Sequence, residues 1–62
     1  MSKFVFTKSR LDDAPATPEM SLEEIVREAA KIHPFSVRRI TKYVSTLEVD
    51  QVLSWFMIRR VS

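Results

Sequence analysis

Glycine and cysteine are both missing from this chain of 62 residues. Without cysteine, disulfides and thiolate metal sites are excluded. Without glycine, and without asparagine, tight turns that need a positive φ have no preferred residue. These absences argue against a fold built from several β-hairpins and favour helices joined by short connections.

Side chains that typically form catalytic or metal sites are also scarce. His33 is the single histidine, so a zinc or haem site and a Ser-His-Asp set find little support. Glu23 and Glu24 are adjacent, but neighbours in sequence do not converge on one substrate, and the helix dipole explains acids at a helix start. We therefore expect a protein that is not an enzyme and that uses no cofactor or metal.

Long hydrophobic runs are absent as well. No run approaches the roughly 20 apolar residues that span a bilayer, and residues 1–20 lack the apolar core of a secretory signal. The lack of cysteine suits a reducing cytoplasm. We expect a cytoplasmic protein with no membrane partner. Because so small a chain buries only about 60% of its unfolded surface, association with a second copy is the expected additional source of stability.

Charge is unevenly distributed although the net charge is only +2. Residues 11–28 are mostly acidic, whereas residues 29–47 contain no acid and four cations: Lys31, Arg38, Arg39 and Lys42. Such a cluster is either a solvated face, which can also pair with acids of the same or a neighbouring chain, or a surface that binds phosphate.

The N-terminal third is predicted to be extended. Residues 3–7, KFVFT, alternate and are rich in aromatic and β-branched types, which predicts a short strand or arm over about 3–8. A single strand must pair with a second copy or lie on the helices. Because the residues that follow are polar and punctuated by proline, residues 1–20 are expected to be arm and linker, and 21–62 a three-helix domain.

The first helix is predicted over about 22–32. Ser21 and Glu24 have the spacing of a capping box, in which each side chain binds the other residue's backbone N–H. His33 should end the helix, because a residue followed by proline, here Pro34, is pushed out of the α region.

Two further helices complete the predicted fold. The second is expected over about 34–44, with Pro34 as its first residue. The third is expected over 46–60, after a second capping box formed by Ser45 and Glu48. The sequence thus predicts an all-α fold of three short helices in a helix-turn-helix-like arrangement.

The C-terminal segment is unusually apolar for one helix of so small a protein. On a helix, its apolar residues would form two stripes, and one further apolar residue would lie outside both. A helix that is apolar on several sides usually contacts something besides its own protein. We therefore expect a binding or regulatory protein whose dimer or partner interface contains Trp55, Phe56, Met57 and Ile58.

The stretch FSVRRITKYVSTLEVDQVLSWFMIRR, residues 35–60, combines a helix, an abrupt corner and a second helix. In this respect it resembles the helix-turn-helix family, whose second helix lies in the major groove of DNA while the first braces the backbone. The resemblance implies that Arg38, Arg39 and Lys42 contact phosphates. It implies that the residues approaching the bases are Thr46, Gln51 and Ser54.

A strand followed by two helices also resembles the ribbon-helix-helix family, in which two chains form a ribbon that reads the major groove. This resemblance implies that the N-terminal strand pairs with its copy and turns Lys3, Val5 and Thr7 outward. The amide end of the second helix, near Phe35 and Ser36, would then bind a phosphate.

Two functions remain open from the sequence. The main expectation is a dimeric transcription regulator that binds double-stranded DNA. The alternative is a protein-interaction module, such as a small inhibitor or adaptor, that lays its apolar C-terminal helix into a groove of a larger partner.

Overall fold

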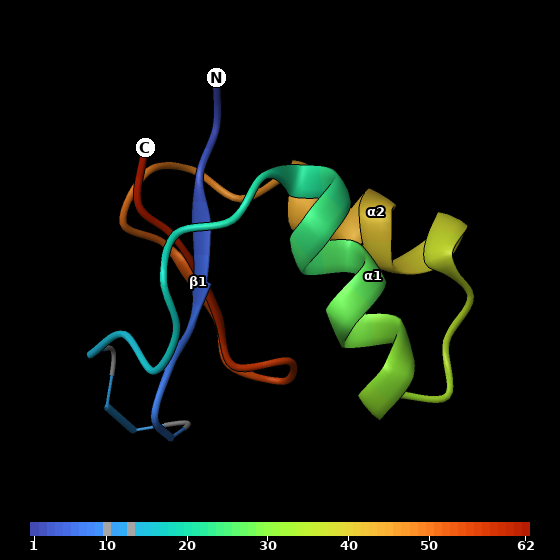
Figure 1. Cartoon of the computed structure of the whole chain (residues 1–62), viewed down its shortest axis with the longest axis horizontal. Coiled ribbons are helices and arrows are strands. Elements are labelled where there is room, and N and C mark those ends of the chain that lie inside the picture. Colours follow the sequence, from blue (N-terminus) through green and yellow to red (C-terminus); the bar gives the residue numbers. More distant parts are fainter. Residues whose placement is uncertain (10, 13) are drawn as a thin grey trace.

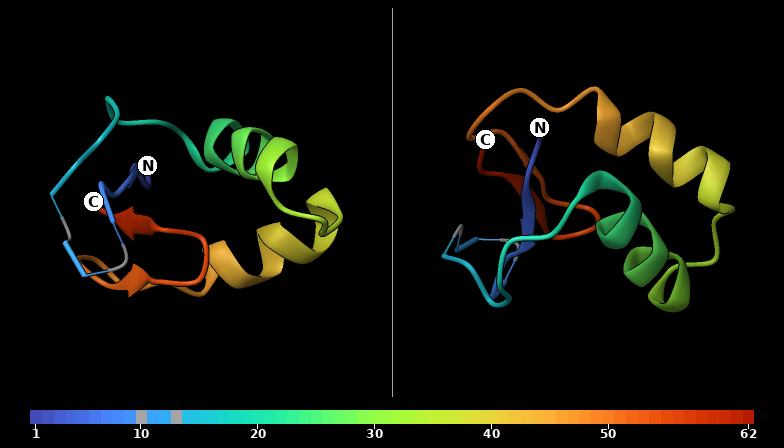
Figure 2. Two further views of the ribbon diagram at one scale, coloured as in Figure 1. Left: turned by 90° about the horizontal axis from the view of Figure 1, so that it is seen from below. Right: turned by 45° about the horizontal axis from the view of Figure 1, so that its top comes forward.

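The computed structural model describes residues 1–9, 11–12 and 14–62, and its fold is α+β. Within these residues, three short antiparallel strands form one sheet, and two helices lie to one side of it (Figures 1 and 2). The strand order is β1 (Phe4–Phe6), β3 (Ile58–Arg60), β2 (Val52–Leu53). The all-α prediction is therefore wrong.

Helix α1 (Leu22–Ile32) confirms the prediction for 22–32. The Ser21 hydroxyl accepts a hydrogen bond from the backbone N–H of Glu24 at 3.2 Å, and the Glu24 carboxylate accepts one from the backbone N–H of Ser21 at 3.3 Å. The helix ends at His33, whose extended backbone is the conformation favoured before proline.

The capping box also makes a testable contribution to stability. The pKa of Glu24 is lowered, first by the backbone N–H of Ser21 and then by the Ser21 hydroxyl. Because the pKa in the folded state lies below the ordinary value, the stabilisation is complete above that ordinary pKa and is lost as pH falls through the lowered one. The melting temperature of the unmodified chain should therefore fall as pH is lowered through this acidic range. Glu24→Gln should make this fall smaller, whereas Glu19→Gln should not. Identical melting profiles for Glu24→Gln and the unmodified chain would contradict this.

Helix α2 (Val37–Ser45) begins later than predicted. Its N-cap is Ser36, whose hydroxyl accepts from the backbone N–H of Arg39 at 3.2 Å, so Pro34 is not its first residue but lies in the connection 33–36. Ser45 is the last residue of α2 and not the cap of a further helix. The predicted second capping box is therefore absent.

The helix predicted over 46–60 is wrong, and with it the predicted helix-turn-helix-like pair of 34–44 and 46–60. A hairpin of β2 and β3 occupies this segment, with Leu53 paired to Ile58. The segment is rich in β-branched and aromatic residues, which suit a pleated surface. Tertiary contacts decide between helix and strand here, because β3 pairs with both other strands and Ile58 becomes fully buried.

The missing glycines did not prevent this hairpin. Among the residues that the structure describes, two take positive φ: Asp50 at 69° and Met57 at 55°. Aspartate adopts the left-handed region more readily than most residues, whereas Met57 accepts a backbone cost of about 1 kcal/mol in the turn that leads into β3. The inference from the absence of glycine to the absence of hairpins fails at Met57, which lies in the hairpin turn, whereas Asp50 lies in the turn before β2.

Strand β1 confirms the predicted extended segment but pairs within its own chain. It lies antiparallel to β3, with Phe4 opposite Arg60 and Phe6 opposite Ile58 (Figure 1). Pairing with a neighbour in the same chain supplies the partner that an isolated strand lacks.

Both faces of the N-terminal strand are covered. Val5 and Thr7 are buried, so the ribbon turned toward DNA that the ribbon-helix-helix resemblance implies is not present. The outer edge of β1 is also occupied, because Phe4 and Met20 exchange backbone hydrogen bonds of 2.8 and 2.7 Å. The predicted linker thus runs beside the strand and shields its edge from other chains.

The core joins the helices to the sheet. Its buried members come from both strands β1 and β3, both helices and the loops between them: Phe4, Ile25, Val26, Ala29, Ile40, Val44, Leu47, Phe56 and Ile58. In the described part of the chain, neither helix is long and apolar enough to cross a membrane.

Candidate nucleic-acid interface and aromatic hollow

One face of α2 is buried and the opposite face is basic. Ile40 and Val44 lie in the core, whereas Arg38, Arg39 and Lys42 are exposed. Residues three and four apart are neighbours on a helix surface, so Lys42 lies beside both arginines. The three cations that sequence reasoning selected are therefore brought together by the structure.

The acids of α1 do not neutralise this basic face. Glu23 pairs with Arg27 at 2.9 Å and Glu28 with Lys31 at 3.3 Å, both within α1. Of the ion pairs among the described residues, none includes a cation of α2. These surface pairs are each worth about 0.2–1 kcal/mol, and they leave the charge of α2 free for another molecule.

The three residues predicted to approach bases lie on separate segments. Thr46 caps α2, and its hydroxyl donates to the Tyr43 carbonyl at 2.8 Å. The side-chain oxygen of Gln51 accepts from the backbone N–H of Glu48 at 2.9 Å, in the loop before β2. Ser54 lies in the turn between β2 and β3. The helix that would have aligned them is not formed.

The four residues predicted to form an interface have different environments. Phe56 is 3% exposed and Ile58 is fully buried, so the chain covers both with its own core. Met57 is half-buried, and Trp55 is 65% exposed. Folding as a hairpin therefore hides much of the apolar surface that a helix would have left exposed, and Trp55 is the main residue left in contact with solvent.

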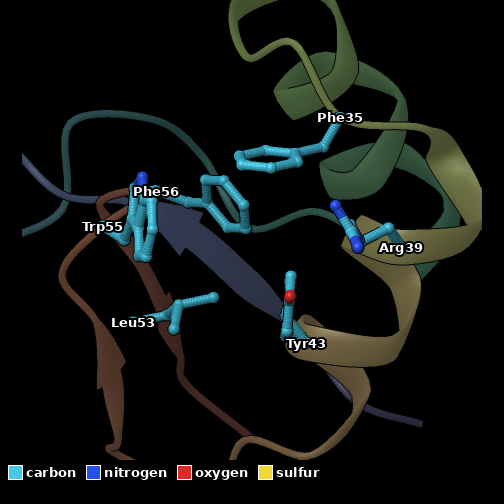
Figure 3. A pocket seen from close by; sticks show the side chains of 6 residues that line it. All are labelled: Phe35, Arg39, Tyr43, Leu53, Trp55 and Phe56. Carbon is cyan, nitrogen blue, oxygen red and sulfur yellow. The ribbon is translucent and has the colours of Figure 1, made fainter.

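Trp55 borders a hollow of about 390 Å³ (Figure 3). In Figure 3 the side chains of Arg39 and Tyr43 lie on one side and those of Trp55 and Leu53 on the other. The lining comes from the connection 33–36, helix α2 and the hairpin: Phe35, Arg39, Tyr43, Leu53, Trp55 and Phe56.

Aromatic contacts order this hollow. The Phe35 ring meets Trp55 edge-on, with centroids 6.1 Å apart and planes at 80°, and meets Phe56 in a similar way at 5.7 Å and 71°. The Arg39 guanidinium carbon lies 5.8 Å from the centre of the Phe35 ring, within the range of a cation–π contact. The hollow therefore has firm apolar walls and one charged group.

Sequence reasoning missed the hollow as a site. Tyr43 borders the apolar side of α2, but it meets the hairpin only because residues 52–60 turn back as strands. The one available signal was the density of aromatic residues after position 33. Their convergence depends on tertiary structure and not on spacing along one element.

Known proteins give no guide to function here. A scan of protein-family models found no match, and searches of curated proteins and of solved structures found no significant match. Among the described residues, no group of three or more histidine, aspartate or glutamate side chains lies where it could hold a metal ion. The function must therefore be argued from the basic face and the hollow.

Proposed function

We propose that this protein is a non-enzymatic, dimeric regulator that binds double-stranded DNA through helix α2. The observation that carries the proposal is the exposed face of Arg38, Arg39 and Lys42, which has no ion-pair partner among the described residues. Cations on one face of a helix supply the phosphate contacts from which most DNA affinity comes.

The helix pair α1–α2 suits this role. In helix-turn-helix proteins a turn of three or four residues joins the two helices, and the second enters the major groove. Here residues 33–36 join α1 to α2, one helix earlier in the chain than the sequence predicted. No acid lies in the first turn of α2, so this turn itself has no carboxylate that would repel a phosphate.

The position of the cations along α2 supports phosphate contacts by all three. Arg38 and Arg39 lie in the first turn and Lys42 one turn later, on the exposed side of the helix. Contacts of this kind fix a protein on the duplex and make its affinity depend on salt.

A dimer is part of the proposal. One copy of α2 offers three cations, whereas two copies related by a twofold axis would contact two half-sites and double the number of phosphate contacts. Two copies would also support a domain whose own core is small.

Amide chemical-shift mapping tests the proposal. On addition of a mixed-sequence duplex at low salt, the largest shifts should fall on residues 37–45 and on the connection 33–36, and the signals should broaden as the complex forms. The outer face of α1, at Glu23 and Arg27, is the internal control because its charges are already paired. A spectrum that does not change, or changes confined to residues outside α2 and its connection, would contradict the proposal.

A further inference from the structure

We propose that the aromatic hollow beside α2 binds a small aromatic carboxylate. Its volume of about 390 Å³ falls within the range of about 300–1,000 Å³ that is usual for small-molecule sites. Such sites are mostly apolar and contain a few polar groups that orient the ligand. The hollow has this composition, with one charged side chain among six lining residues.

Arg39 determines the charge of the ligand. It is the charged group of the hollow, and none of the ion pairs within residues 1–9, 11–12 and 14–62 involves it. Its contact with the Phe35 ring holds the guanidinium at the wall. A planar guanidinium with several N–H donors fits a carboxylate through two parallel hydrogen bonds, so we assign the acid group to Arg39.

The rings determine the apolar part of the ligand. Phe56 is 3% exposed and forms the floor, whereas Trp55 and Tyr43 remain 65% and 43% exposed at the sides. Edge-to-face contacts such as that between Phe35 and Trp55 are the geometry that aromatic rings prefer, and a further ring can join them. An aromatic ligand would remove these exposed faces from water.

The site would also affect DNA binding, a consequence that rests on the proposed function. Arg39 belongs both to the hollow and to the basic face of α2. A carboxylate bound to Arg39 would neutralise its charge and occupy its donors, so ligand and DNA would compete for this side chain. Loss of one cation should lower the salt slope of DNA binding by about 1.

Trp55 is the only tryptophan of the chain and lies in the wall of the hollow, so its fluorescence reports occupancy directly. The probes are 3-phenylpropionate and its uncharged analogue 3-phenylpropionamide, added to the unmodified protein without DNA. We expect a saturable shift of Trp55 emission toward shorter wavelength with the acid. The amide should bind about tenfold more weakly, because it lacks the charged hydrogen bonds to Arg39.

Neighbouring arginines provide the matched variants. Arg39→Ala should weaken binding of the acid about tenfold, whereas Arg38→Ala, which does not line the hollow, should leave it unchanged. Arg39→Lys keeps the charge without the planar fork and should fall between the two. Circular dichroism of each variant checks that α2 is intact.

Three results would overturn the site. They are equal affinity for the acid and the amide, no shift with either, or an emission shift on concentrating the protein alone, which would show a second copy in the hollow. A separate arm measures duplex binding with and without the acid. If the acid binds but DNA affinity does not change, competition for Arg39 is refuted while the site stands. If DNA does not bind at all, the proposed function fails without affecting the fluorescence result.

Discussion

Phe56→Ala is expected to abolish the folded state at room temperature. Phe56 is 3% exposed, and its ring centre lies 4.6 Å from that of His33 and 5.7 Å from that of Phe35. Truncating a buried phenylalanine costs about 3–5 kcal/mol, because contacts are lost and a cavity remains. A domain of this size, without disulfides or a metal, rarely has more than about 3–5 kcal/mol of stability to lose.

The adjacent residue is the matched control. Trp55→Ala removes a larger side chain that is 65% exposed, so the main loss is its edge-on contact with Phe35, which is worth about 1 kcal/mol. Circular dichroism during heating and urea titration should therefore show an unfolded Phe56→Ala protein beside a folded Trp55→Ala protein. Equal loss of stability in the two variants would contradict the hairpin, which places these neighbours in opposite environments.

Removal of the three cations of α2 is expected to abolish DNA binding. Each arginine or lysine that contacts DNA contributes about 1 kcal/mol or more, so the combined change of Arg38, Arg39 and Lys42 to alanine should weaken duplex binding by about a hundredfold or more. Fluorescence anisotropy of a labelled duplex at low salt measures this loss.

The variant should keep its fold. All three side chains are exposed, the buried face of α2 is untouched, and alanine is the best helix former. The control removes two ion-paired cations of α1, Arg27→Ala with Lys31→Ala, and should bind nearly as tightly as the unmodified protein. If the α2 variant binds as well as this control, then α2 is not the DNA-binding surface.

Local signals explain which parts of the fold could be predicted from the sequence. Helix α1 depends on the Ser21–Glu24 capping box and on Pro34, all within one short segment, and it formed with the predicted bounds. The basic face of α2 follows from the spacing of its cations, which a shift of the helix start by three residues does not change. Strand β1 was recognisable from its alternation.

The C-terminal segment could not be predicted because its apolar pattern fits two structures. Short apolar runs are ambiguous between helix and strand when periodicity alone decides. The choice depended on β1, at the opposite end of the chain, which pairs with β3 and allows Ile58 to enter the core. The hollow shares this dependence, since Phe35 and Tyr43 approach Phe56 only when the hairpin is folded against them.

The salt dependence of duplex binding by the unmodified protein tests the DNA-binding role of α2 most directly. Each phosphate contact contributes a slope of about −0.9 to log K against log salt, so three cations per chain predict that a fourfold rise in salt weakens binding about fortyfold for each bound chain. The α2 triple variant should lose this slope. Absence of binding by the unmodified protein at the lowest salt concentration, or an affinity that does not change with salt, would contradict the account.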